Sequence, residues 1–359
     1  MVKKKIVHFI YDLGRGGAET MMVRVIKELR EYEHTVVTLF PLNLFNEELQ
    51  ADKLICLNLK SLFQLPLAVF KFRKIIKSEK PDIVHTHLFW PTTIARLAVP
   101  KRIVLITTIH AFIASSVEYK NWYIRLIDKL TYRFRKSIII VVAKGALEEY
   151  FSFLKIKPYK AYVLYTFVDI ERFNGIAATA KESTGIFKII SVGALREQKN
   201  QRYLVEAFAQ LKDQPFELHI YGEGDKRPLL EDMIKTTGAN VVLKGNVTNI
   251  EAMIPQYDLF TMSSTFEGFS LGVLEAMAMG MPLLLSDIKS FKEQCEETAT
   301  YFDLADTNDF VHRLQELYKD KDRLQKMAAA GKERAVQNFT LTHNISSLRK
   351  IYTEAVYNN

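Results

Sequence analysis

The chain has 359 residues, of which 48% are hydrophobic and 25% are charged, and its net charge is +8. This length exceeds one comfortable core and predicts two domains of a soluble enzyme. Two cysteines, Cys56 and Cys295, exclude a disulfide framework and a cysteine-based zinc site. No apolar run reaches the roughly 18 residues of a membrane span, and no secretory cleavage site follows residues 6–10, so we expect a cytoplasmic protein.

The basic charge is concentrated in the first half of the chain. Residues 1–170 hold 27 basic and 15 acidic residues, a net charge of +12, whereas residues 171–359 hold 22 and 26, a net charge of −4. A basic half joined to a mildly acidic half indicates two domains with different partners.

The first half alternates short apolar runs with segments of helical spacing. Strands of a buried sheet are predicted at residues 5–11, 34–40, 83–86, 103–108 and 138–142, where β-branched residues are frequent. A turn at Gly14, Gly16 and Gly17 precedes a predicted helix over residues 19–30.

The second half repeats this scheme. Strands are predicted at residues 187–192, 216–221, 241–244, 259–262 and 282–286, helices at 201–212, 227–236 and 271–279, and terminal helices at 306–337 and 342–357. Two successive β/α arrays predict an α/β protein with two doubly wound domains, divided near residues 165–175.

Residues 263–282 have the features of a phosphate site. Gly268 lets a ligand approach the backbone, Ser270 is the predicted N-cap of a helix that begins at Leu271, and Gly280 and Pro282 end that helix. The free N–H groups at such a helix start attract a phosphate.

Two glutamates flank this helix start. Glu267 lies in the loop and Glu275 lies just over one turn inside the helix, so both carboxylates can face one ligand. The alternative is a capped amphipathic helix with two solvated glutamates. The apolar neighbours of Glu275 argue against it, because a carboxylate in such surroundings needs a partner.

Residues 267–282, E-G-F-S-L-G-V-L-E-A-M-A-M-G-M-P, resemble the paired-glutamate signature of retaining GT-B glycosyltransferases, the large group 1 or family 4-like family. The resemblance implies that Glu267 contacts the donor sugar and that Glu275 binds the ribose. The backbone groups that it implies for the sugar and diphosphate follow Gly268, at Phe269, Ser270 and Leu271.

The resemblance also implies the GT-B architecture, in which two Rossmann-like domains face a central cleft. Residues 1–168 would bind the acceptor, residues 169–337 would bind the nucleotide-sugar, and a helix at 338–359 would pack back toward the first domain. The donor, a UDP- or GDP-linked sugar, is then a substrate, and neither a cofactor nor a metal is expected.

A turn between a predicted strand and helix, residues 191–200, carries two cations. Arg196 and Lys199 can stabilise the charge on a leaving diphosphate, although most such pairs are solvated surface charges. From Gly193 onward the segment resembles the family's G-R-L-x-x-x-K motif. Lys199 matches that motif, whereas Ala194 stands where the family has arginine, and Arg196 comes two residues later.

Further glycines resemble loops of the same family. Gly16 and Gly17 match its G-G-A-E loop, beside the acceptor cleft and the donor phosphates. A dinucleotide fold is the alternative, but the G-x-G-x-x-G spacing and an acidic residue after the second strand are missing. The resemblance places further substrate contacts at Gly222, Gly245 and Val247.

Three histidines, His85, His87 and His110, follow predicted strands, where α/β sheets bind ligands. A lone histidine there is more often structural, and His85 matches an architectural D-x-x-H pattern of the family. His110 matches the family's histidine near the reaction centre, and His8 is a predicted core residue. The predicted catalytic residues are therefore Glu267, His110, Arg196 and Lys199.

Metal and membrane sites have one sequence candidate each. Asp320-Lys321-Asp322 matches an Asp-x-Asp motif, but a solvated helix face is expected there, and the sequence contains no metal-binding His/Cys/Asp cluster. Residues 119–136 interleave basic and aromatic side chains, as a helix on an anionic bilayer does. An amphipathic helix that packs on its sheet is the alternative, and the charge of +12 favours the membrane.

These features predict a retaining, metal-independent glycosyltransferase of cell-surface polysaccharide synthesis. It would move a sugar from a nucleoside-diphosphate sugar to a hydroxyl of a glycan or lipid-linked acceptor, at the inner face of the plasma membrane and without a nucleic acid partner. A sugar-nucleotide epimerase and a non-catalytic nucleotide-sugar binding protein are the alternatives. A nicotinamide oxidoreductase is disfavoured by the missing dinucleotide fingerprint.

Overall fold

A computed structural model describes residues 3–113, 118–173, 185–247 and 249–357. The chain forms two compact units. The first contains residues 1–166 and 342–359, and the second contains residues 167–341. The sequence placed these divisions at residues 168 and 337.

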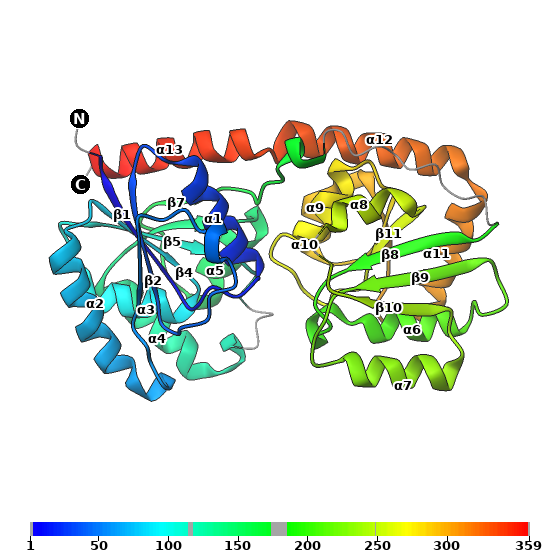
Figure 1. Cartoon of the computed structure of the whole chain (residues 1–359), viewed down its shortest axis with the longest axis horizontal. Helices are drawn as coiled ribbons and strands as arrows, with labels where there is room; N and C mark the ends of the chain where they lie inside the picture. Colours follow the sequence, from blue (N-terminus) through cyan, green and yellow to red (C-terminus); the bar gives the residue numbers. More distant parts are fainter. Residues whose placement is uncertain (1–2, 114–117, 174–184, 248, 358–359) are drawn as a thin grey trace. The chain divides into compact units, whose positions relative to one another are not determined.

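The first unit is built on a seven-stranded parallel sheet (Figure 1). Its strand order is β3-β2-β1-β4-β5-β6-β7. The strands are β1 (Lys5–Ile10), β2 (Glu33–Thr38), β3 (Lys53–Cys56), β4 (Ile83–His87), β5 (Val104–Ile109), β6 (Ile138–Val141) and β7 (Ala161–Val163). Helices connect most of them, namely α1 (Gly17–Glu28), α2 (Leu65–Glu79), α3 (Phe89–Ala98), α4 (Trp122–Phe134) and α5 (Lys144–Leu154).

Alternation along the strands sends side chains to two separate cores. Val7 and Phe9 of β1 pack with α2 and α3, whereas Ile10 packs with α1. Val36 and Val37 of β2 divide in the same way. The sheet is therefore covered on both faces, as a doubly wound fold requires.

The terminal helix α13 (Leu341–Tyr357) packs on the face that carries α1. The Tyr352 hydroxyl lies 2.7 Å from His85 Nδ1 of β4, and Arg349 forms an ion pair with Glu31. The Asn344 side chain donates to the Tyr165 carbonyl at 2.7 Å. These contacts attach the C-terminal segment to the first unit.

The second unit has a six-stranded parallel sheet in the order β10-β9-β8-β11-β12-β13. The strands are β8 (Phe187–Val192), β9 (Phe216–Tyr221), β10 (Val241–Gly245), β11 (Leu259–Met262), β12 (Leu283–Ser286) and β13 (Thr300–Phe302). The helices are α6 (Gln201–Ala209), α7 (Arg227–Thr237), α8 (Ile250–Met253), α9 (Leu271–Ala278), α10 (Lys289–Cys295), α11 (Thr307–Lys319) and α12 (Lys321–Asn338). Two parallel Rossmann-like sheets with helices confirm the predicted fold class.

Several boundaries differ from the predictions. The short strands β3, β7 and β13 were not predicted, and β3 is an edge strand with two exposed positions, so it lacks an apolar run. The predicted helix 306–337 is interrupted at Asp320, which caps α12 by accepting the Arg323 N–H at 2.9 Å. Asp320 therefore lies between two helices rather than on a helix face. In the described parts of the chain, no helix is long and apolar enough to cross a membrane.

Candidate functional site

The strand order of the second sheet changes direction between β8 and β11. Ligands of doubly wound folds bind outside the carboxyl ends of the strands at such a switch point. The segment after β8 contains Arg196 and the short helix η5 (Glu197–Lys199), and the segment after β11 contains Glu267. The fold thus gathers predicted residues from two distant stretches of sequence at the position where a ligand is expected.

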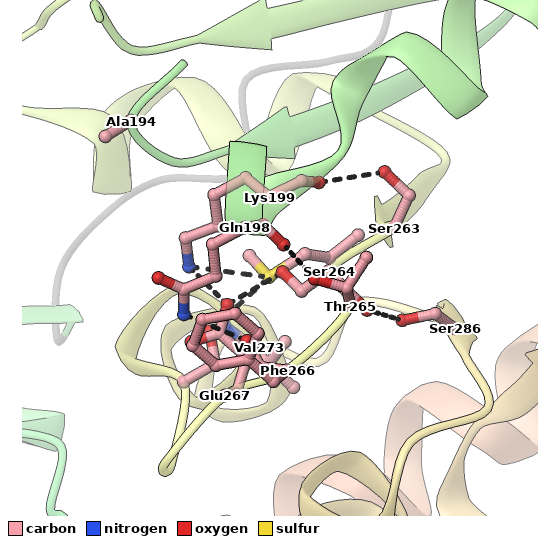
Figure 2. A network of polar contacts seen from close by, with 12 residues as sticks. Ala194, Gln198, Lys199, Ser263, Ser264, Thr265, Phe266, Glu267, Val273 and Ser286 are labelled. Carbon is pink, nitrogen blue, oxygen red and sulfur yellow. Dashed lines mark hydrogen bonds and ion pairs between the residues drawn. The ribbon is translucent and has the colours of Figure 1, made fainter. Parts of the chain in front are cut away.

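Hydrogen bonds join these two segments, as Figure 2 shows. The Gln198 carbonyl accepts the Thr265 N–H at 2.9 Å, and the Gln198 side-chain amide donates to the Phe266 carbonyl at 2.9 Å. The Ser263 hydroxyl donates to the Lys199 carbonyl at 3.1 Å. The turn at η5 is therefore fixed against the loop that precedes α9.

Lys199 and Glu267 form an ion pair across the two segments (Figure 2). Lys199 Nζ lies 2.6 Å from Glu267 Oε1, and the two side chains are 20% and 9% exposed. The Ser264 hydroxyl donates to the same oxygen at 2.7 Å. Glu267 Oε1 thus has two donors, whereas Oε2 takes part in neither contact. Ser264 was missed because a single serine in a loop carries no spacing signal.

Arg196 differs from Lys199 in its surroundings. It is exposed, and it directly precedes η5. Its backbone N–H donates to the Ala194 carbonyl at 2.9 Å, and its guanidinium makes no recorded ion pair or hydrogen bond with another described residue. Of the two predicted cations, Lys199 is held by Glu267, and Arg196 remains available to an anion from outside.

The start of α9 has fewer available N–H groups than the sequence suggested. Ser270 caps the helix as predicted, with its hydroxyl 3.5 Å from the Val273 N–H. Its own N–H, however, donates to the Gln294 side chain at 3.1 Å, and that amide donates back to the Ser270 carbonyl at 2.9 Å. The expectation that the Ser270 N–H is free for a phosphate is therefore not met. No described group accepts the N–H groups of Leu271 and Gly272.

The remaining predicted residues of this segment lie in different environments. Phe269 is buried and packs edge-on against Phe339, with ring centroids 5.0 Å apart, so its side chain belongs to the core. Gly268 lies in the loop between Glu267 and α9. Glu275 is half-buried in the second turn of α9, between neighbours that are fully buried.

Gly222 and Gly245 have a packing role that the sequence did not reveal. The Gly222 N–H donates to the Gly245 carbonyl at 2.8 Å, and both residues have positive φ angles, 140° and 73°. A Cβ on Gly222 would lie 2.1 Å from the Gly193 carbonyl oxygen. The loops after β8 and β9 and the end of β10 therefore meet backbone to backbone. Val247 is exposed beyond this contact.

In the first unit the predicted glycine turn becomes part of a helix. Helix α1 begins at Gly17, two residues earlier than expected, and Gly16 is its N-cap. The Gly16 carbonyl accepts the Thr20 N–H at 3.0 Å, and a Cβ on Gly16 would lie 2.4 Å from a carboxylate oxygen of Glu19. The missing side chain at Gly16 lets the Glu19 side chain fold back over the helix start.

His110 follows β5 directly and is paired with a second histidine. Its Nε2 lies 3.0 Å from Nδ1 of His87, the last residue of β4. Burial lowers the pKa of His110 to about 4. His85 lies in the interior, where its ring nitrogens contact the hydroxyls of Tyr352 and Thr108 at 2.7 Å each.

The structure assembles a histidine cluster that the sequence analysis did not find. One ring nitrogen each of His8, His85 and His87 lies within 4.8 Å of the others, which is a spacing that could hold a metal ion. His8 is buried, as predicted. Both nitrogens of His85 are already engaged by hydroxyls, and no carboxylate belongs to the group to offset a buried dication. The cluster is a poor match for a divalent metal.

Comparisons with known proteins identify the family and the fold of this chain. The family described as glycosyltransferase family 4 matches residues 15–172, and the family described as glycosyl transferases group 1 matches residues 186–320. A galactosaminyltransferase of Campylobacter jejuni, named for an undecaprenyl-diphosphate-linked substrate, is 27% identical over 90% of this chain and 92% of its own. An Escherichia coli galactosyltransferase, named for UDP-galactose and a diphosphoundecaprenol-linked sugar, is 25% identical over 85% and 83%.

A solved structure supports the fold. HepE of Anabaena, in complex with UDP-glucose, has a TM-score of 0.85 and 18% identity, with 98% of this chain and 99% of that chain covered. At this identity the likeness concerns the architecture alone. With the two family matches, one over each unit, the chain belongs to the group 1 glycosyltransferases of the GT-B fold.

Proposed function

We propose that this protein transfers a sugar, with retention of configuration, from a UDP- or GDP-linked donor to a hydroxyl of a lipid-linked or glycan acceptor in cell-surface polysaccharide synthesis. The similar Campylobacter and Escherichia proteins are named for undecaprenyl-linked substrates, and HepE was crystallised with UDP-glucose. The second unit would bind the donor and the first unit the acceptor, in the cytoplasm.

The observation that carries this proposal is the Lys199–Glu267 pair at the switch point of the second sheet. A diphosphate beside Lys199 would give its ammonium a second anionic partner, while Glu267 Oε2 can accept a sugar hydroxyl. Arg196 and the N–H groups of Leu271 and Gly272 would share the phosphate charge.

Charge stabilisation of this kind supports the chemistry. As the bond between sugar and phosphate breaks, negative charge grows on the departing diphosphate, and preorganised cations lower the barrier. These cations would do the work that a metal does in other transferases. The acceptor hydroxyl would attack from the face that the phosphate leaves and give its proton to that phosphate. Glu275 would bind the ribose hydroxyls.

The donor and the reaction can be tested together. In thermal-shift measurements, either UDP-sugars or GDP-sugars should raise the melting temperature of the protein, because a ligand that binds only the folded state stabilises it. Transfer is then followed with that donor and an undecaprenyl-diphosphate sugar. A donor epimerised without acceptor, or bound without turnover, would contradict the proposal and support one of the alternatives.

We also propose that helix α4 rests on an anionic bilayer. Four of its exposed apolar side chains repeat every four residues, and they are Trp122, Leu126, Leu130 and Phe134. Trp122 is 68% and Phe134 67% exposed. Arg125, Lys129 and Arg133 follow the same spacing one position earlier, so apolar and basic stripes run side by side. Such a helix binds through apolar burial and lipid charge.

Vesicle co-sedimentation tests this surface. Binding should increase when phosphatidylglycerol is added to phosphatidylcholine vesicles, and Trp122→Ala with Phe134→Ala should weaken it. Leu229→Ala, at an exposed residue of α7 in the second unit, is the matched control. Binding that is independent of anionic lipid, or unaffected by the double substitution, contradicts the membrane proposal and leaves the transferase proposal intact.

A further inference from the structure

Buried histidines on three neighbouring strands share one face of the first sheet. His8 on β1 is in register with His85 on β4, and His34 on β2 is in register with Ile6 on β1. Val7, Val84 and Phe9 belong to the opposite face, with α2 and α3. His8, His34, His85 and His87 therefore point to the face covered by α1 and α13.

The protonation of two of these rings follows from one backbone carbonyl. His34 Nε2 lies 2.8 Å from the Leu29 carbonyl oxygen, which can only accept, so Nε2 carries the proton. Burial lowers the pKa of both His34 and His8, so both rings are neutral near pH 7. His34 Nδ1 is then an acceptor, and His8 Nε2, 3.1 Å away, must donate to it. His8 Nδ1 is left as a bare acceptor.

His8 also lines a small cavity. The cavity has a volume of about 50 Å³, and its polar lining includes His8, His85, His87 and His110. His8 Nδ1 and His87 Nε2 are buried and bond to no described group. One ring nitrogen each of His8, His85 and His87 lies within 4.8 Å of the others, so nitrogens of this cluster are close enough to share one water at ordinary hydrogen-bond distances. Most of the lining is apolar, but a cavity of this size can hold a water where two polar partners such as these nitrogens are present.

We propose that His87 is a positioning residue for His110, and that a water in this cavity links His87 to His8. In this chain, His110 Nε2–H donates to His87 Nδ1, His87 Nε2–H donates to the water, and the water donates to His8 Nδ1. All of these hydrogen bonds therefore run in one direction, toward the Leu29 carbonyl. Hydrogen bonds that run in one direction polarise and strengthen one another. The chain fixes His110 with a proton on Nε2 and a bare Nδ1.

This arrangement gives His110 a defined role, which rests on the proposed function. A bare Nδ1 accepts a hydrogen bond and cannot donate one, so it would hold a sugar hydroxyl through that hydroxyl's proton. The buried chain behind His110 keeps its ring from turning. His87 touches no substrate and acts only through His110.

The positioning is tested on the unliganded protein by NMR of the histidine ring nitrogens. The wild type should show His110 as one tautomer, protonated at Nε2, with a slowly exchanging ring proton. His87→Phe keeps an aromatic ring but offers no acceptor, and should lose that protected signal. His87→Asn places an amide oxygen near the position of Nδ1 and should restore it. His312→Asn, at an exposed histidine of α11, should leave the signal unchanged.

Two results would overturn the positioning role, whatever the protein transfers. One is a wild-type His110 protonated at Nδ1, and the other is a His110 signal that is the same in His87→Phe. Melting temperatures of both His87 variants show whether either has unfolded. Because His87→Asn is the smaller change, its recovery of the signal separates a lost hydrogen bond from a damaged core.

Turnover tests the functional link separately. With the identified donor, His87→Phe should lower kcat by about 10- to 100-fold, as small misplacements of reacting groups do, and His87→Asn should recover most of it. In a His110→Ala background, His87→Phe should add no further loss. If the NMR signal changes and kcat does not, the positioning stands and the catalytic assignment of His110 fails.

Discussion

Two ion pairs, one in each unit, place charge in the interior in different ways. In the first unit, Arg96 of α3 pairs with Asp128 of α4, and their side chains are 0% and 3% exposed. The hydroxyls of Tyr119 and Tyr150 donate to the two Asp128 oxygens at 2.5 and 3.1 Å. Both carboxylate oxygens are thus occupied, and the network joins α3, α4 and α5 away from the strand ends.

The pair Lys199–Glu267 in the second unit is more open. It lies at the carboxyl ends of β8 and β11, its lysine is one-fifth exposed, and both recorded donors to Glu267 use a single oxygen. An enclosed pair with both oxygens occupied can only stabilise the fold. A pair with an accessible cation at a switch point can also take a ligand as a further partner. Their substitutions should therefore have opposite signatures.

The largest effect is expected at acidic pH, where the first unit should lose stability. Burial lowers the pKa of its histidines His8, His34, His85, His87 and His110, that of His110 to about 4. Below pH 6.5 the unfolded chain takes up protons that the folded unit excludes, so stability is complete above pH 6.5 and falls toward pH 4. For each histidine, a pKa that is lower by 1 in the folded protein costs about 1.4 kcal/mol of stability at low pH.

The two tryptophans, Trp90 and Trp122, both belong to the first unit, so their fluorescence reports on it alone. On acidification the fluorescence transition should precede the loss of total helix signal in circular dichroism. In the second unit, burial lowers the pKa of His219, so that unit also has an acid-sensitive group. Coincident transitions would show that the histidine cluster does not make the first unit the weaker one.

The next largest effect is expected for Asp128→Asn. The substitution keeps the shape of the side chain but leaves the Arg96 guanidinium buried without a counter-charge, which costs about 3–5 kcal/mol. Urea unfolding followed by tryptophan fluorescence measures this loss. Glu48→Gln, which breaks the exposed pair with Arg15 in the same unit, should leave the midpoint unchanged. A similar midpoint for both variants would mean that the enclosed pair is not a stabilising element.

This contrast also separates what the sequence can predict from what it cannot. The strands around the site in the second unit are apolar runs, and the motif residues Glu267 and Lys199 follow them. The fold class and the pairing of these two segments could therefore be predicted from the sequence. The Ser270 cap was predictable from local chemistry. The Gln294 side chain that accepts the Ser270 N–H comes from α10, and no local sequence pattern predicts such a contact.

The polar contacts of the first unit could not be predicted from the sequence for the same reason. His8, His34 and His85 are far apart in sequence, and only the strand order β2-β1-β4 brings them together. Arg96 and Asp128 read as ordinary charges on amphipathic helices, and their burial depends on how α3 packs against α4. Periodicity shows which face of an element is buried. It does not show which polar partners meet there.

Lys199→Ala is expected to give the opposite signature to Asp128→Asn. Removing the ammonium deletes charge stabilisation of the leaving diphosphate and should lower kcat by roughly 10²–10³-fold, with little change in the unfolding midpoint. Lys226→Ala is the matched control, because Lys226 pairs with Glu197 of η5. Full activity in Lys199→Ala, or a loss shared equally by Lys226→Ala, would contradict the assignment of this pair as the donor site.

The smallest effect is expected for Ser264→Ala, which removes the second donor to Glu267 Oε1. A hydrogen bond to a charged group contributes about 1.5–3 kcal/mol, but Lys199 remains as a partner, so the effect should fall at the lower end. Because Glu267 would lose its fixed orientation, the change should appear in kcat and the donor KM more than in stability.

Ser286→Ala gives the matched comparison within the same loop. The Ser286 hydroxyl donates to the Ser264 carbonyl at 2.7 Å, so it supports the backbone but does not touch the carboxylate. Its removal should lower the melting temperature and spare the donor KM. If Ser286→Ala changes the donor KM as much as Ser264→Ala does, then loop position rather than the hydroxyl contact sets the orientation of Glu267.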